Sequence, residues 1–154
     1  MVSKMYRMNK DLALKKLTEK ERAKLVNQLK NTVAPDDVVA AILSHLSKEE
    51  IPLNVHKIHS AVFKLKQKNP EMFEEFIFST KDYYPYSYLL EQVLFRLQNA
   101  DLINTLNLGF KKCIVSKESK AYIRKDVLPL FGNEDRKKLE KMGKTFEKAV
   151  LSTS

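Results

Sequence analysis

The stretch that decides the fold covers residues 35–65 and reads PDDVVAAILSHLSKEEIPLNVHKIHSAVFKL. Proline is favoured at the first position of a helix, and the two aspartates after it complement the positive helix end. Apolar residues then recur every three or four positions, which predicts a helix from Pro35 to about Ser47. Ile51-Pro52-Leu53 reads as extended backbone, because proline disfavours helix in the residue before it. Asn54 is a suitable cap for a second amphipathic helix that ends near Lys68.

The chain beyond this stretch predicts one more helix and then a β-hairpin. Ser87 is a suitable cap for a helix that reaches about Asn99. The apolar pattern then changes, and residues 102–106 and 110–115 look like two strands. Gly109 supplies the turn between them, because glycine adopts positive φ without a steric penalty.

Further helices are predicted on both sides. Thr18 and Glu21 have capping-box spacing, which predicts a helix near the N-terminus. Ser116 opens a helix that runs toward Phe131, and Glu134 lies in the first turn of a last helix. We therefore divide the chain into a basic helical extension (1–34), a core (35–131) and a C-terminal helix (132–154).

Charge is unevenly distributed along the 154 residues, whose net charge is +9. Nine basic and three acidic residues lie in 1–35, seven and ten in 36–110, and twelve and six in 111–154. Basic ends suit a polyanion such as double-stranded DNA, although lysine-rich helices are also simply well solvated. A single cysteine excludes an internal disulfide, and no apolar run is long enough to cross a bilayer. We expect a cytoplasmic protein without a membrane segment.

The order helix, extended piece, helix, helix and hairpin is the order of a winged helix, in which three helices share one interior and the hairpin closes it. The predicted fold is therefore mainly α, with a winged-helix core and extra N- and C-terminal helices. One feature departs from a DNA-binding helix-turn-helix. Such a unit joins its helices by roughly three or four residues, whereas seventeen residues, 69–85, separate the second and third helices here.

Four short segments resemble a narrower group: Val55 to Leu65, Phe76-Ile77-Phe78, Tyr83-Tyr84-Pro85-Tyr86-Ser87, and Leu97 to Ile103. They are similar to the winged-helix domains of the Panacea antitoxin-like and related uncharacterised prokaryotic families. Those families have glycine where this chain has Tyr84, so the backbone bend is expected to differ. The resemblance covers well under half of the chain. It implies a small regulatory or partner-binding module from a prokaryote or mobile element, and not an enzyme.

The first functional hypothesis is a DNA-binding regulator. In the helix after Ser87, Arg96 is the only basic residue and is accompanied by Glu91. Phosphate contacts are therefore expected mainly from the wing and the helix after it, with lysines of the second helix joining them. The predicted nucleic-acid-binding residues are Lys57, Lys64, Tyr88, Gln92, Arg96, Lys111, Lys112, Lys117 and Lys120. The alternative for the lysines is an ordinary solvated face.

The second hypothesis is a protein-interaction module, either antitoxin-like or a homodimer. It places the interface on one apolar face of the last helix, formed by Leu139, Met142, Phe146 and Val150.

Other candidate sites are weaker. The tyrosines of 83–88 could anchor a partner when exposed, but more often such rings close the edge of a core. His56 and His59 share a helix face, yet a zinc site needs more ligands than they supply. No phosphate-binding loop, nucleophile motif or carboxylate pair is recognisable. We therefore expect no enzyme activity, metal, cofactor or small-molecule substrate.

Overall fold

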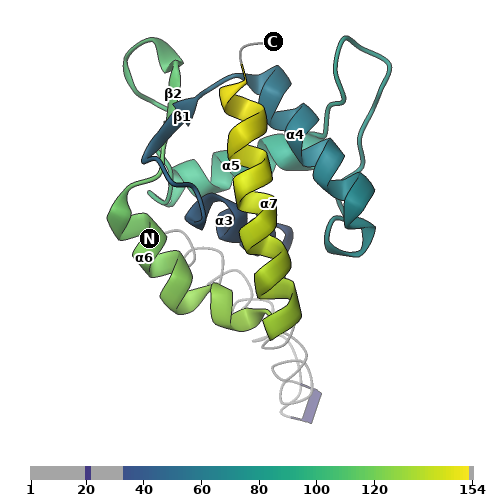
Figure 1. The fold of residues 1–154 in the computed structure, drawn as a ribbon, viewed down its shortest axis with the longest axis vertical. Coiled ribbons are helices and arrows are strands. Elements are labelled where there is room, and N and C mark those ends of the chain that lie inside the picture. The colour runs from purple at the N-terminus through teal and green to yellow at the C-terminus, as the bar shows by residue number, and fades with distance from the viewer. Residues whose placement is uncertain (1–19, 22–32, 153–154) are drawn as a thin grey trace.

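The computed structural model describes residues 20–21 and 33–152, which are mainly helical (Figure 1). Within them lie five α-helices and one two-stranded antiparallel sheet. The elements are α3 (Pro35–Ser44), β1 (Glu50–Pro52), α4 (Val55–Lys68), α5 (Tyr88–Asn99), β2 (Lys112–Ile114), α6 (Lys117–Asp126) and α7 (Asn133–Leu151), with short 3₁₀ turns η1 (Pro70–Met72), η2 (Leu108–Phe110) and η3 (Leu128–Leu130). The helix predicted from Thr18 lies outside the described residues, apart from Lys20 and Glu21, which are helical.

The predicted helix starts are confirmed by their caps. The side chains of Asn54, Ser87 and Ser116 each accept a hydrogen bond from the backbone amide three residues later. Pro35 is the first residue of α3. Each cap satisfies an amide that the helix itself cannot pair, so these short polar residues fix where α4, α5 and α6 begin.

The predicted hairpin is only partly present. β2 pairs with β1 in antiparallel register, with Ile51 opposite Cys113. The other predicted strand, 102–106, contributes a single bridge between Asn104 and Ile114. The chain between them turns at Gly109, whose φ of 78° is in the left-handed region that glycine tolerates.

A side chain takes the place of the missing ladder. The Asn107 amide nitrogen donates to the Lys112 carbonyl over 2.6 Å, and the Lys112 amide donates to the Asn107 side-chain oxygen over 3.2 Å. Both backbone groups of Lys112 on that edge are therefore satisfied without a facing strand. β2 pairs with β1 on one side and with the isolated bridge at Asn104 on the other.

α3 lies at the centre of the molecule, and its residues from Val38 to Ser44 are all buried. α3 packs against α5, α6 and α7, and α7 also packs against α4 (Figure 1). Gly143 lies at a close contact between α7 and the end of α3, because a Cβ atom there would come within 2.5 Å of His45 Cβ. α7 is thus part of one continuous apolar core rather than an appendage.

This packing shows that the predicted partner face is wrong as an exposed interface. Leu139, Met142, Phe146 and Val150 are buried and belong to the core cluster. Their spacing was that of a buried helical stripe, and the surface that covers it is the chain's own α3 and α4. α6 is also shorter than predicted, since η3 replaces its last turn around Pro129.

No helix among the residues that the structure describes has the length and hydropathy needed to span a membrane.

Candidate partner-binding surface

The outer side of α5 carries a stripe of exposed residues, which we call the α5 outer stripe: Tyr88, Gln92, Phe95 and Asn99. Their spacing places them on one helix face, while Leu90, Val93 and Leu97 face the core. Tyr88 and Phe95 each leave 65% of their surface in solvent. Tyr88 and Phe95 thus place two large aromatic rings on one helix face. Exposed apolar residues on an ordinary protein surface are instead scattered singly.

A second pair of exposed apolar side chains lies on the loop before β2. Leu106 and Phe110 are more than 60% exposed. This loop is attached to α5, because Gln98 accepts hydrogen bonds from the backbone amide and the hydroxyl of Thr105 at 2.5 and 3.0 Å. Two hydrogen bonds to one side chain therefore join this loop to the end of α5.

The only basic residue of α5 is bonded inside the molecule. Arg96 forms a two-point ion pair with Asp36 at the start of α3, with Nε–Oδ2 and Nη2–Oδ1 distances of 2.8 and 2.7 Å. The Asp36 side chain is only 7% exposed. Arg96 was predicted to contact nucleic acid, and its position instead joins α5 to α3. The outer stripe is left with no basic side chain.

Lys120 was also predicted to contact nucleic acid, but it is buried. Its Nζ atom donates to the carbonyls of Leu46 and Lys48 at 2.8 and 2.9 Å. Burial lowers the pKa of this amine. Glu147 of α7 holds the same segment, accepting hydrogen bonds from the amides of Ser47 and Lys48 and from the Ser47 hydroxyl. These hydrogen bonds outweigh the effect of burial and lower the pKa of Glu147.

The remaining predicted nucleic-acid contacts do not gather in one place. Lys57 donates to the carbonyl of Ser152, and Lys112 forms an ion pair with Glu50 at 3.3 Å. The exposed residues are Lys64 on α4, Tyr88 and Gln92 on α5, Lys111 and Lys112 at the sheet, and Lys117 on α6. Within the described part of the chain, these exposed lysines lie on α4, at the sheet and on α6, and none of them lies on α5.

The tyrosines before α5 divide into two groups. Tyr84 stacks on His56 at 4.0 Å, and Tyr86 stacks on His59 at 4.8 Å between ring centroids. Tyr83 and Tyr88 project into solvent. The core interpretation therefore applies to Tyr84 and Tyr86, which hold the loop on α4.

His59 fixes the start of α5. It is 1% exposed, and its Nδ1 accepts a hydrogen bond from the Ser87 amide at 3.1 Å. Burial lowers its pKa to about 4, so the ring is neutral at pH 7. An acceptor at Nδ1 requires the neutral tautomer with its proton on Nε2. His59 thus serves as a structural hydrogen-bond acceptor.

A cavity of about 260 Å³ opens between α4, the loop that carries Tyr84 and Tyr86, and α5. Its lining is mostly apolar and aromatic, and Glu91 is its single carboxylate. The lining residues are Leu53, Val55, Ile58, His59, Tyr84, Tyr86, Glu91 and Leu94.

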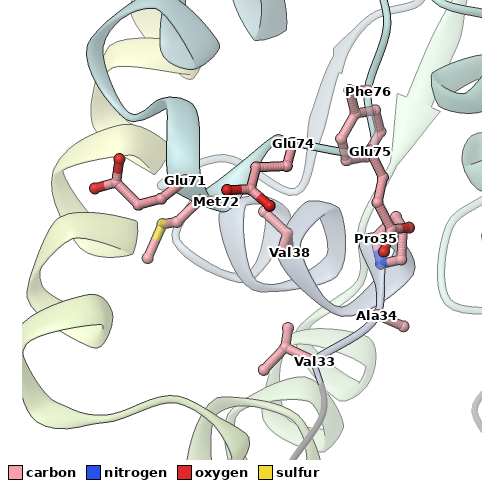
Figure 2. A pocket seen from close by; sticks show the side chains of 9 residues that line it. All are labelled: Val33, Ala34, Pro35, Val38, Glu71, Met72, Glu74, Glu75 and Phe76. Atoms are coloured by element: carbon pink, nitrogen blue, oxygen red, sulfur yellow. The ribbon is translucent and has the colours of Figure 1, made fainter.

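A hollow of about 190 Å³ with a different character lies between the start of α3 and η1 (Figure 2). Glu71, Glu74 and Glu75 line it together with Met72 and Phe76. Glu71 is 3.7 Å from the Lys138 amine. This acidic hollow is separate from the residues around the α5 outer stripe.

Phe95 and Leu106 were missed as candidate site residues by sequence reasoning. Phe95 falls off the spacing of the buried positions of α5, and this offset is the signal that could have identified it. Leu106 gave no such signal, because it fell in the predicted strand 102–106. An apolar residue in a fully paired strand is expected to face the core.

No protein-family model matches the chain, and no curated protein or solved structure matches it significantly.

Proposed function

We propose that this protein is a protein-interaction module. It binds a partner protein through the α5 outer stripe and through Leu106 and Phe110 on the loop before β2. The observation that carries the proposal is the exposure of Tyr88 and Phe95 on a helix whose only cation is bonded to Asp36. Exposed aromatic rings anchor protein interfaces, because they bury a large apolar area at a small entropic cost.

The fold is proposed to be a winged-helix variant. The order α3, β1, α4, α5 and β2 agrees with it, as does the isolated bridge between Asn104 and β2 on the side away from β1. In such a fold α5 occupies the place of the recognition helix. A recognition helix that reads DNA presents cations and amides to the groove. α5 presents the amides of Gln92 and Asn99, but it also presents two aromatic rings and Glu91, and its one cation is bonded to Asp36. This combination favours a protein ligand.

DNA binding is a second candidate because Lys111 and Lys117 remain exposed on either side of β2. Such contacts would hold phosphates without reading base sequence. Anisotropy of a labelled mixed-sequence duplex at low salt tests this candidate. Our proposal predicts at most weak binding that Lys111→Gln with Lys117→Gln leaves unchanged. Tight, salt-sensitive binding that this double variant abolishes would favour the DNA candidate instead.

The interaction proposal is tested with two matched double variants of the full chain. Tyr88→Ser with Phe95→Ser alters the α5 outer stripe, and Ile77→Ser with Tyr83→Ser removes two apolar side chains that are exposed elsewhere. Wild type and both variants are immobilised, and the proteins captured from the source organism are compared quantitatively. We expect the α5 variant alone to lose a specific partner. Equal capture by all three chains would contradict the proposal.

A further inference from the structure

The cavity beside α5 has an aromatic corner. The rings of Tyr84 and Tyr86 are 6.4 Å apart between centroids and nearly perpendicular, at 80°. Each ring has a histidine of α4 stacked on one face, so its orientation is fixed before any ligand arrives. The face of a tyrosine ring carries negative π charge, so an aromatic lining of this kind favours a cationic ligand.

The charge of the cavity comes from one group. Among its lining residues, only a histidine, His59, and a carboxylate, Glu91, have side chains that can be charged near pH 7. Burial lowers the pKa of His59 to about 4 and so keeps this ring neutral. Glu91 is exposed, and its carboxylate forms no ion pair with any residue in the described part of the chain. In a chain with a net charge of +9, the described residues thus form here an apolar cavity whose one carboxylate is that of Glu91.

We propose that this cavity receives an arginine side chain of the partner protein, an inference that rests on the proposed interaction function. A guanidinium is planar, stacks on aromatic rings and forms two hydrogen bonds with a carboxylate. The methylene stem of arginine would pack on Leu53, Ile58 and Leu94. An ammonium is more strongly hydrated and cannot make the two-point contact, so lysine is the weaker fit.

The size and position of the cavity agree with this occupant. Its volume of about 260 Å³ lies below the roughly 300 to 1,000 Å³ of pockets for drug-sized ligands, which suits a single side chain. Glu91 lies on α5 one turn from both Tyr88 and Phe95. A partner segment that covers the α5 outer stripe would thus lie beside Glu91, which lines the cavity.

The test titrates N-acetylarginine methylamide into the ¹⁵N-labelled full chain and follows the amide resonances of Tyr84, Tyr86, Glu91 and Leu94. The uncharged isostere N-acetylcitrulline methylamide is the matched ligand. We expect the arginine probe to bind with a Kd on the order of 1 mM, as its small size allows. The citrulline probe should bind about tenfold more weakly. Equal responses to the two probes would overturn the proposal.

Three variants locate the binding site. Glu91→Gln should weaken arginine binding about tenfold, because the charge-assisted hydrogen bonds are lost. Tyr84→Leu should weaken it about fivefold. Glu75→Gln, in the acidic hollow of Figure 2, should leave it unchanged. Undiminished binding by Glu91→Gln, or resonance shifts confined to the acidic hollow, would contradict the assignment.

This experiment uses no partner, so its failure differs from failure of the proposed function. If arginine does not bind while the α5 variant loses its partner, the interaction surface stands and the arginine site is wrong. If arginine binds at Glu91 while capture is unchanged in the α5 variant, the cavity binds guanidinium but the proposed interaction surface is wrong.

Discussion

α7 and α5 are both amphipathic helices, yet they place different side chains in solvent. α7 buries its apolar stripe against α3 and α4 and exposes lysines on its outer side: Lys137, Lys141, Lys144 and Lys148. α5 buries a comparable stripe but exposes Tyr88 and Phe95. The apolar face of α7 is explained by the core, whereas the exposed rings of α5 have no such explanation. Apolar residues outside the buried stripe are therefore the better indicators of a binding surface.

The largest effect should separate the aromatic residues of the two helices. Phe146→Ala leaves a cavity between α7 and the core and should lower the free energy of unfolding by about 4 kcal/mol. Phe95→Ala removes a ring that is mostly in solvent and should change it by less than about 0.5 kcal/mol. Urea denaturation measures both. Similar losses would mean that Phe95 is a core residue.

The next effect concerns the support of α5 by His59. The pKa of His59 in the folded chain is about 4, below the ordinary value of 6.5, so between these pH values the unfolded chain binds a proton that the folded chain does not. The contribution of His59 to stability should be fully present above pH 6.5. The free energy of unfolding should fall by at most about 3 kcal/mol as the pH is lowered to 4.

His59→Gln is the control, because glutamine offers an acceptor to Ser87 without titrating. Subtracting its pH dependence removes the contribution of the carboxylates. Wild type and variant that lose stability in parallel between pH 6.5 and 4 would show that His59 is not buried as a neutral ring.

A smaller effect tests the close contact between α3 and α7. At an ordinary helix position Gly→Ala is stabilising. At Gly143 the added Cβ would lie 2.5 Å from His45 Cβ and 3.0 Å from the Ile42 carbonyl oxygen. We expect Gly143→Ala to cost about 2 kcal/mol and Thr145→Ala, on the exposed side of α7, to be nearly neutral. Thermal denaturation compares the two, and a stabilised Gly143→Ala would show that the helices do not touch there.

The smallest effect concerns Arg96. Because half-exposed ion pairs contribute modestly, Arg96→Met should lower stability by about 1 kcal/mol. A double-mutant cycle with Asp36→Asn should show that this loss depends on the partner. If Arg96 instead served a ligand outside the chain, the two substitutions would be additive and stability would change little.

Local chemistry allowed much of the fold to be predicted. The side chains of the caps Asn54, Ser87 and Ser116 accept hydrogen bonds from amides only three residues away. The starts of α4, α5 and α6 therefore follow from the local sequence. The hairpin did not follow, because Asn107 satisfies the backbone of Lys112 with a side chain. An apolar pattern indicates a paired strand only where the backbone amides and carbonyls have no side chain to bond and must pair with another strand.

The candidate site was less predictable for a different reason. Arg96 and Lys120 are cations at helix positions that a sequence cannot place relative to Asp36 or to the carbonyls of Leu46 and Lys48. These bonds join residues 60 or more positions apart. An apolar stripe on α7 likewise gave no information about whether its cover is internal or external. Such facts depend on tertiary packing.

Site-specific photocrosslinking in cells of the source organism tests directly whether α5 carries the partner-binding surface. A photoreactive phenylalanine analogue is placed at position 95 on α5 or at position 137 on the solvent side of α7. We expect a discrete protein adduct from position 95 and none from position 137. Adducts from position 137 alone, or no protein adduct from position 95, would contradict the proposal.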